Sequence, residues 1–291
     1  MELLREMGNQ VSLIHGSEFG VTRTLSFCPG TGDGVISDRN GSRIRANDIS
    51  AVWYRRPGRP RANDVISDRL DRAFAESEWQ HAIDGFFSSL PARVVSPPFM
   101  QRSAIKPRQL AAARDEGLRV PESLITNEID EALAFVEKYG RVIHKASSSP
   151  PHRFLDTRTW GCREMECIEE ISLCPIILQE QIDGPSDIRA TIIGNRIFAA
   201  RIDKSERYSG PDSRLDLDAT CQPHELPDEV SSRLLRVMDR LGLLFATVDL
   251  KLTENRDYVF FEVNPQGQFL YIEILTGLPI SSTIAGFLAD C

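Results

Sequence analysis

The fold is decided by residues 245–268, which read FATVDLKLTENRDYVFFEVNPQGQ. Apolar residues recur through 245–252 and again through 258–264, and the polar residues 253–257 separate the two runs. Two alternating runs around a short polar turn are typical of a β-hairpin. We therefore predict two antiparallel neighbouring strands close to the C-terminus.

Two carboxylates and one amide lie on this predicted hairpin, at Asp249, Glu262 and Asn264. If the turn centres on residue 255, Asp249 lies opposite either Phe261 or Glu262, and in the second register the carboxylates are direct neighbours. A hard divalent cation would relieve their repulsion, and Mg²⁺ accepts such oxygens while it keeps water and phosphate ligands. The alternative is a solvated strand face, but Glu262 lies within VFFEVNP, where an unpaired charge is costly. The trio is our predicted magnesium site.

Two lysines occupy positions suited to nucleotide phosphates. Lys106 stands at the entry of a predicted helix, and Lys145 closes an apolar strand predicted over 141–145. The polar stretch 146–159 that follows predicts a flexible loop of the kind that closes over a ligand. A single lysine is most often a solvated surface charge, so neither position is decisive alone. Lys145 is the stronger candidate because a charge is less expected at the end of an apolar strand.

Residues 179–182 follow a predicted buried strand and read Gln-Glu-Gln-Ile. The backbone around Gln179 and Glu180 is suited to hydrogen-bond an adenine edge, and Ile182 is suited to cover the ring. This segment is our predicted adenine site.

Charged residues alternate along two further predicted strands, which a two-residue Gly-Asn turn joins into a hairpin. Asp187 and Arg189 fall on one face, where Asp187 could accept from ribose hydroxyls and Arg189 could bind a phosphate or a developing acyl phosphate. Arg201, on the partner strand, could add a second positive group. The alternative for these three residues is a cross-strand salt bridge.

Composition shifts at Pro97-Pro98, which predicts a domain boundary there. Before it, apolar runs predict strands at 11–14 and 51–54, and an amphipathic pattern predicts a helix over 68–87. After it, helix-capping and alternation patterns predict helices over 107–116, 128–139 with Asn127 as its N-cap, and 228–241, and strands over 141–145, 175–180, 188–193 and 196–202.

Charge and hydropathy exclude two classes of protein. The formal net charge of −8 argues against a general nucleic-acid binder, which needs a clustered basic surface. The longest apolar runs, such as 174–178 and 241–246, fall far short of the roughly 20 residues that span a bilayer, and residues 1–6 do not resemble a signal peptide. We expect a cytoplasmic protein.

The order of these signals resembles that of the ATP-grasp superfamily, over residues 97–280. Within and before that range, VWYRRP at 52–57, GLRVP at 117–121 and EVNPQGQ at 262–268 are similar to the microviridin-type peptide macrocyclases, also called graspetide maturases. The resemblance therefore includes the N-terminal part of the chain.

The resemblance implies a three-lobed α/β (α+β) ATP-grasp fold that holds ATP between its second and third lobes. We expect a pre-ATP-grasp lobe over 1–97, a central subdomain over 98–180 and a C-terminal subdomain with the Mg²⁺ site over 181–291. Family members usually open with a strand, whereas residues 3–7 here predict a helix, so the first strand is expected to be missing.

The resemblance also implies an activity. ATP phosphorylates an Asp or Glu side chain of a ribosomal precursor peptide with a leader and a core, and a Thr, Ser or Lys side chain then displaces phosphate to close an ester or amide ring. Lys106, Lys145, Arg189 and Arg201 would supply positive charge during phosphoryl transfer. Arg55 and Arg56, which close a predicted strand, are candidates to hold the acidic side chain of the core, with a structural salt bridge as the alternative.

Two other functions are weighed against this one. The first is an ATP-grasp ligase that joins two separate molecules, as glutathione synthetase and the glutamate-adding ligases do. The second is a non-catalytic ATP-binding module, although the complete set of Asp249, Glu262 and Asn264 exceeds what binding alone requires. Homodimer formation is left open.

Overall fold

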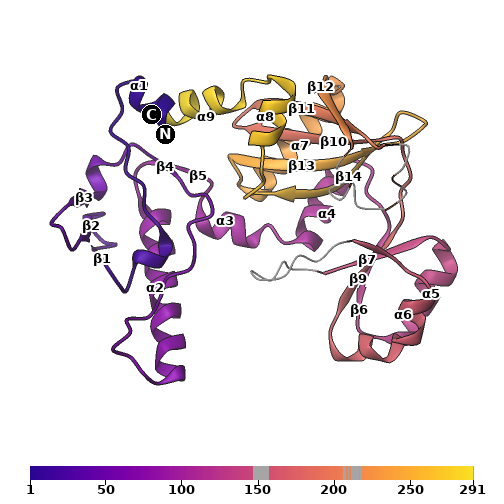
Figure 1. The fold of residues 1–291 in the computed structure, drawn as a ribbon, viewed down its shortest axis with the longest axis horizontal. Coiled ribbons are helices and arrows are strands. Elements are labelled where there is room, and N and C mark those ends of the chain that lie inside the picture. The colour runs from indigo at the N-terminus through magenta and orange to yellow at the C-terminus, as the bar shows by residue number, and fades with distance from the viewer. Residues whose placement is uncertain (147–156, 206–207, 209, 211–215, 217, 291) are drawn as a thin grey trace.

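A five-stranded antiparallel sheet in the C-terminal part of the chain carries the candidate site (Figure 1). In this computed structural model, which describes all residues except 147–156, 206–207, 209, 211–215, 217 and 291, the strand order is β12-β11-β10-β13-β14. The strands are β10 (Ser186–Ile193), β11 (Arg196–Asp203), β12 (Thr220–His224), β13 (Phe245–Leu252) and β14 (Tyr258–Asn264). Both predicted hairpins, β10 with β11 and β13 with β14, are confirmed.

Helices cover both faces of this sheet. On one face, α4 (Lys106–Asp115) and α7 (Asp228–Leu241) bury apolar side chains of the strands, among them Ile188 and Leu250. On the other, α8 (Leu270–Thr276) and α9 (Ile280–Ala289) pack around Ile193 and Phe245. Burying these side chains stabilises the fold by removing apolar surface from water. The alternation of the strands therefore directs one set of residues into each of two cores.

A second, smaller sheet lies below the first in Figure 1 and has the order β6-β9-β7-β8. Its strands are antiparallel neighbours, and α5 packs its Ala132 against Val142 and Leu178 of this sheet. The elements are β6 (Ser123–Thr126), α5 (Ile129–Tyr139), β7 (Val142–Lys145), β8 (Arg158–Thr159), α6 (Cys162–Glu166), a 3-10 helix (Ile168–Leu173) and β9 (Ile176–Glu180). Strand β7, which ends at Lys145, and strand β9, which leads into the predicted adenine site at 179–182, are therefore neighbours in this sheet. Most of the predicted loop 146–159 lies outside the described residues.

The N-terminal lobe packs a long helix, α2 (Arg69–Ser89), against a small antiparallel sheet and a parallel strand pair. The remaining elements are α1 (Glu2–Glu6), β1 (Arg23–Phe27), β2 (Gly34–Asp38), β3 (Arg43–Arg45), β4 (Ala51–Trp53), β5 (Arg93–Val95), the connecting helix α3 (Pro98–Ser103) and two 3-10 turns (Gly16–Glu18 and Ala46–Asp48). Leu4 of α1 packs into the core beside α9, which brings the two termini together (Figure 1). In the described part of the chain, no helix is long and apolar enough to cross a membrane.

Two local predictions are wrong. Residues 11–14 form no strand, because Leu13 is 57% exposed and only Ile14 of the four contacts the lobe's core. Asn127 does not cap α5, since Glu128 precedes the first turn and the Asn127 amide instead donates to the Ser172 carbonyl at 3.5 Å. The predicted boundaries at 97/98 and 180/181 fall at the start of α3 and at the end of β9 and remain predictions.

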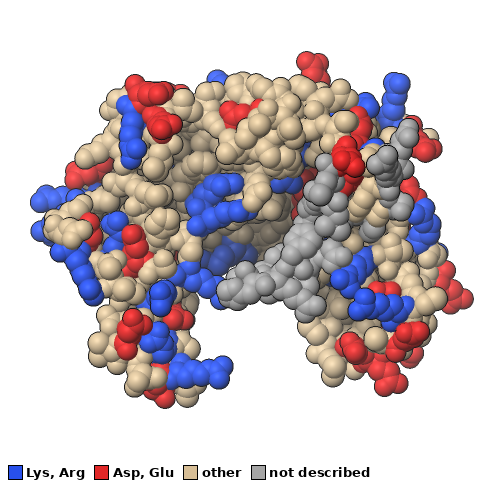
Figure 2. Space-filling view, in the orientation of Figure 1, with Lys and Arg blue, Asp and Glu red and all other residues tan. Residues whose placement is uncertain are grey.

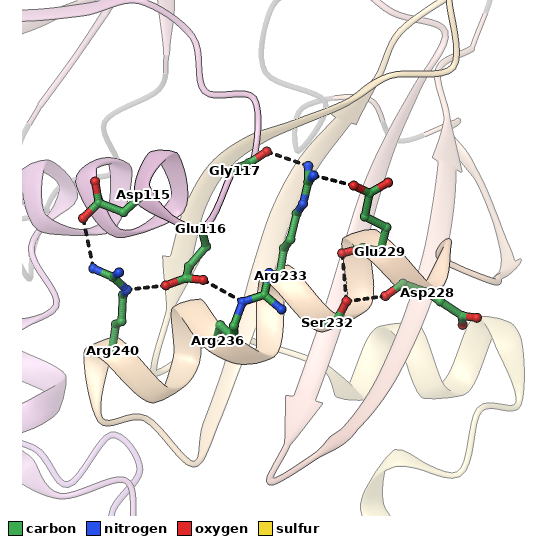
Figure 3. Close-up of polar contacts among 9 residues, drawn as sticks. All are labelled: Asp115, Glu116, Gly117, Asp228, Glu229, Ser232, Arg233, Arg236 and Arg240. Atoms are coloured by element: carbon green, nitrogen blue, oxygen red, sulfur yellow. Dashed lines mark hydrogen bonds and ion pairs between the residues drawn. The ribbon is translucent and has the colours of Figure 1, made fainter.

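An ion-pair network ties the end of α4 to α7 (Figure 3). Glu116 accepts from Arg236 Nε at 2.6 Å and also pairs with Arg240, whose Nη1 lies 3.0 Å from Asp115 Oδ2. Arg233 Nη1 donates to the Gly117 carbonyl at 2.6 Å. Three arginines of one helix face therefore hold the residues that end the helix carrying Lys106.

This network predicts a pH-dependent stability. Hydrogen bonds from Arg236 and then Arg240 hold the pKa of Glu116 below its ordinary value of 4.5. A carboxylate with a lowered pKa stabilises the fold above the unfolded pKa and loses that contribution as pH falls. Glu116→Gln should therefore melt below wild type near neutral pH, and the difference should close below about pH 4.

Thermal unfolding followed by circular dichroism across pH would measure this difference. Glu137→Gln, at an exposed position of α5, is the matched control. A melting difference for Glu116→Gln that did not change with pH would contradict the assignment.

Candidate active site

The predicted carboxylates meet across the last hairpin. Asp249 of β13 is the direct partner of Glu262 of β14, which is the second of the two predicted registers, and Thr247 is the partner of Asn264. The register shifts directly afterwards, because Leu250 pairs with Phe260 and leaves Phe261 as an extra residue. Such a bulge bends the strand and re-aims the side chains beside it. The three predicted metal ligands therefore share one face at the end of the hairpin.

Each of the two carboxylates faces a cation from a different element. Arg189 of β10 donates from Nη1 to both oxygens of Asp249, at 2.8 and 3.1 Å, and from Nη2 to Thr247 Oγ1 at 3.0 Å. Lys106 Nζ lies 3.7 Å from Glu262 Oε2 and donates to the Ala146 carbonyl at 3.1 Å. The site is thus close to charge-neutral.

Burial shapes the acidity of this pair. It raises the pKa of Asp249, and the charge of Glu262 adds to that rise while Arg189 opposes it. Burial alone would lower the pKa of Arg189, yet Asp249 beside it brings the net shift upward. The charge of Arg189 therefore helps to keep Asp249 ionised, and a bound cation would favour the ionised form of Asp249 further.

The donor set suits a hard cation. Carboxylate and amide oxygens are the ligands that Mg²⁺ accepts, and Asn264 Oδ1 is held in place by the Gln266 N–H at 3.0 Å. Across the described residues there is no cluster of three or more His, Cys, Asp or Glu side chains that could bind a metal. A cation at this hairpin would therefore need the amide, water and phosphate to complete its shell.

A second ion pair lies beside the first on the same face. Asp187 is the cross-strand partner of Lys251, as Arg189 is of Asp249, and the Lys251 ammonium pairs with the Asp187 carboxylate. Lys251 is only 2% exposed. The cross-strand salt bridge that the sequence left as an alternative is therefore present for both Asp187 and Arg189.

Arg201 is not brought to this face. Its direct partner is Ile188, which is buried in the core against α7, so alternation places Arg201 on the opposite side of the sheet from Arg189. There it donates from Nε to Asp203 Oδ1 at 2.7 Å and from Nη2 to Oδ2 at 3.0 Å. The geometry gives no support to the predicted catalytic role of Arg201.

The predicted nucleotide residues of the central sheet lie on adjacent strands. Lys145 Nζ donates to Gln179 Oε1 at 2.9 Å, and the Gln179 amide donates to Ser123 Oγ at 2.8 Å. Gln179 is 1% exposed, so its side chain positions Lys145. Glu180 N–H donates to the Glu122 carbonyl at 2.9 Å. Ile182 lies in the connection between β9 and β10, where the two sheets meet.

Arg55 reaches from the N-terminal lobe to the segment after Asn264. Its Nη2 donates to the Gly267 carbonyl at 2.7 Å, and its guanidinium carbon lies 5.4 Å and 5.3 Å from the ring centres of Trp53 and Phe269. Burial lowers the pKa of Arg55, and the charge of Arg56 lowers it further. Its Nε is buried without a hydrogen-bond partner in the described part of the chain. An anion would satisfy this group.

Arg56 is held in a strained backbone conformation with φ at +46°. Its N–H donates to Gln266 Oε1 at 2.5 Å, and its Nε donates to the Gln266 carbonyl at 3.2 Å. Strain of this kind persists only where the surroundings impose it, which is common at functional sites.

Residues 265–268, the connecting loop, join the two arginine sites. Arg189 donates from Nε and Nη2 to the Gln268 carbonyl at 3.2 and 3.0 Å, one residue beyond the carbonyl that Arg55 holds. The loop begins directly after Asn264. The predicted substrate, phosphate and metal residues are thereby linked through one short segment. Figure 2 shows that this face of the molecule is hollowed, with Lys and Arg side chains on the walls of the hollow.

Sequence reasoning missed the residues that position this loop and hairpin. Gln109 of α4 is 4% exposed, donates to the Val263 carbonyl at 2.8 Å and accepts from Val263 N–H at 2.9 Å, which fastens α4 to the edge strand. Lys106 is one helical turn earlier and so lies near Glu262. Tyr271, whose ring centre lies 5.8 Å from the Arg189 guanidinium, was also missed. No local pattern in the sequence signals either contact.

Fold and site together define an ATP-grasp ligase, and ATP is the nucleotide that this fold binds. Residues 103–288 match the model of the RimK-like ATP-grasp domain, and residues 1–102 match that of the MvdD pre-ATP grasp domain. The chain belongs to the RimK-like ATP-grasp family, which confirms the predicted ATP-grasp membership. No curated protein matches it.

Several solved structures share the fold over the whole chain. The macrocyclase MdnC from Microcystis aeruginosa MRC, bound with precursor peptide MdnA, is 26% identical with a TM-score of 0.86, and the match covers 100% of this chain and 94% of that one. The macrocyclase MdnB of the same organism is 27% identical, with a TM-score of 0.80 and the same coverage. A RiPP-associated ATP-grasp ligase from Chryseobacterium gregarium, in complex with ADP and a leader and core peptide, is 24% identical, covers 99% and 91%, and has a TM-score of 0.85.

Proposed function

We propose that this chain uses ATP to activate Asp or Glu side chains of a ribosomally made precursor peptide and to close side-chain ester or amide rings within it. One observation carries the proposal. Arg55 of the N-terminal lobe and Arg189 of the large sheet donate hydrogen bonds to the carbonyls of two adjacent residues in the same loop. An acidic side chain bound by the first arginine would lie next to the groups that act on the phosphate. MdnC and MdnB, which match over the full chain, are both described as macrocyclases.

ATP binding is assigned to the meeting point of the two sheets. Residues 179–182 would receive the adenine, with Ile182 against the ring, and Asp187 would accept from the ribose. Lys145, oriented by Gln179, and Lys106 would contact the phosphates; the contact of Lys106 with Ala146, the residue after Lys145, supports a shared role. Asp249, Glu262 and Asn264 would hold Mg²⁺, which would neutralise phosphate charge and polarise the transferring group.

The charged groups of the site pair with one another at the hairpin. Lys106 with Glu262 and Arg189 with Asp249 neutralise each other in this structure. When the metal and the nucleotide bind together, the carboxylates would gain the cation and the lysine and arginine would gain phosphate oxygens. Mg²⁺ without nucleotide would have to compete with both cations, so we expect it to bind weakly alone.

The reaction divides into two balanced steps. The peptide carboxylate oxygen attacks the γ-phosphorus, and ADP leaves to give an acyl phosphate. A Thr or Ser hydroxyl or a Lys amine of the same peptide then attacks the acyl carbon, loses its proton and displaces inorganic phosphate. Arg189, which is largely buried and carries its donors on a planar guanidinium fork, is suited to stabilise the phosphoryl oxygens through both steps.

Incubation with ATP, Mg²⁺ and a candidate precursor peptide with a leader and an acidic core tests the proposal. Each bond closed removes one water, so the peptide mass should fall by about 18 Da per ADP formed. ATP consumption that leaves the peptide mass unchanged would reject macrocyclisation and favour a ligase that joins separate molecules. Nucleotide binding without peptide-stimulated phosphate release would indicate a non-catalytic module. A homodimer and a cytoplasmic location remain predictions.

The arginine pair gives a prediction about substrate binding. Arg56→Ala should raise KM for the precursor by roughly tenfold, the worth of one charge-assisted hydrogen bond, and leave KM for ATP unchanged. Steady-state phosphate release with each substrate varied in turn measures both constants. Arg43→Ala, at an exposed position of β3, is the control. Normal peptide KM and turnover in Arg56→Ala would remove Arg56 from the substrate site.

A further inference from the structure

A cavity of about 560 Å³ opens between α2 and α3, next to the connecting loop. Gln266 of that loop lines it together with Tyr54, Arg59, Gln80 and Arg102. No residue predicted from the sequence to touch nucleotide or substrate lines this cavity, although Tyr54 directly precedes Arg55. Its place in the fold is therefore adjacent to the proposed substrate carboxylate site and separate from it.

A buried carboxylate organises the cavity wall. Asp84 of α2, 8% exposed, accepts from Gln80 Nε2 at 3.0 and 3.1 Å and from the Tyr54 hydroxyl at 3.3 Å, and pairs with Arg102 at 2.5 Å. All three partners line the cavity. Because Asp84 fixes them from behind, polar groups at the surface of the cavity are held ready for a ligand.

The inner end of the cavity connects to Arg56 through amides. Gln101 Nε2 donates to the carbonyls of Tyr54 and Ser96 at 2.8 and 2.6 Å, and its side chain is hydrogen-bonded to that of Gln266. Gln266 Oε1 accepts from the Arg56 N–H at 2.5 Å. A peptide with one side chain at Arg55 and Arg56 would thus have its neighbouring residues at the cavity mouth.

The charge of the lining favours an acidic ligand. Arg59 is exposed at the rim, and Arg102 keeps half of its side chain accessible while pairing with Asp84. Glu76 is the one carboxylate among the lining residues, and its Oε1 accepts from the Ala62 N–H. Glu76 keeps its negative charge, and Arg102 is paired with Asp84. Arg59 makes no ion pair with another described residue, so Arg59 is the cation of the lining that is available to an acidic side chain.

We infer that this cavity is a second peptide subsite, which binds an acidic side chain close in sequence to the Asp or Glu that reacts. The inference rests on the proposed function, because it takes the occupant to be the same peptide. Arg59 supplies the charge, and the Gln80 side chain, whose Nε2 is oriented by Asp84, recognises a polar group of the bound segment through its oxygen. The subsite would select which carboxylate of an acidic core reaches Arg55.

A charge reversal at the rim tests the subsite. Binding of the fluorescently labelled precursor is measured by anisotropy in the presence of a non-hydrolysable ATP analogue, with Arg59→Glu compared with wild type. We expect Arg59→Glu to bind the precursor about tenfold more weakly than wild type at low salt. At high salt, where charges are screened, the two affinities should become equal. Arg61→Glu is the matched control, because Arg61 is also exposed, lies two residues away and does not line the cavity.

A set of peptides identifies the group that is recognised. Each acidic residue of the core is changed in turn to its amide, and one such peptide should bind wild type and Arg59→Glu equally. Equal affinities of Arg59→Glu and Arg61→Glu for the unmodified precursor would overturn the inference. Since binding is measured without turnover, this result decides the subsite even if no ring closes, and the mass measurement decides the proposed function separately.

Discussion

Glu262→Gln is expected to lower peptide-dependent ADP formation by roughly 10³-fold, the equivalent of about 4 kcal/mol of transition-state charge stabilisation. The substitution keeps the shape of the side chain and removes the charge that lies opposite Asp249 and 3.7 Å from Lys106. A cation held by one carboxylate and two amides would bind less tightly and neutralise less of the phosphate charge. The loss should therefore appear in kcat as well as in metal affinity.

Binding measurements separate this loss from a general defect. Calorimetry should show weaker binding of ATP with Mg²⁺ to Glu262→Gln and nearly unchanged binding of ATP in the presence of a chelator. Glu254→Gln, in the exposed turn of the same hairpin, is the control and should leave both unchanged. Turnover of Glu262→Gln within a fewfold of wild type would show that the hairpin does not hold the catalytic metal.

The hairpins were predictable because their information is local. Alternation sets the strands and the face of every side chain, and a short polar turn limits the register to two choices. The bulge at Phe261 selected the one that pairs Asp249 with Glu262. The sequence also contained the information needed to place Arg201 on the opposite face of the sheet from Arg189. A two-residue turn after Ile193 pairs it with Arg196, so Arg189 must pair with Ala200 and not with Arg201.

Contacts between residues far apart in the sequence could not be predicted from local sequence patterns. Gln266 meets Arg56 across 210 residues of chain, and Gln109 meets Val263 across 154, and both contacts depend on how packed lobes dock. The prediction of a strand at 11–14 failed for a related reason, because no strand among the described residues pairs with it and two of its four residues, Ser12 and Leu13, are exposed. A pattern of residue types predicts an element only where the tertiary structure supplies a partner.

Gly267→Ala should lower kcat/KM by about 100-fold without unfolding the protein, an effect of the size expected when reacting groups move by about 1 Å. A Cβ at this position would lie 1.8 Å from Thr247 Oγ1 and 2.6 Å from its Cβ, so the connecting loop must shift. That loop presents the carbonyls of Gly267 and Gln268 to Arg55 and Arg189. Both proposed arginine sites would lose their alignment together.

Two further variants make this prediction specific. Gly286→Ala on α9 is the matched control, since its Cβ would meet nothing within 4 Å; it should keep wild-type kinetics and melt at or slightly above wild type, because alanine favours a helix more than glycine does. All three atoms nearest to the Gly267 Cβ belong to the Thr247 side chain. Thr247→Gly removes them, so adding it to Gly267→Ala should restore part of the activity although it also removes the hydrogen bond to Arg189. Kinetics of Gly267→Ala equal to those of Gly286→Ala would mean that the loop tolerates displacement; rescue by Thr247→Gly would show that its position couples peptide binding to phosphoryl transfer.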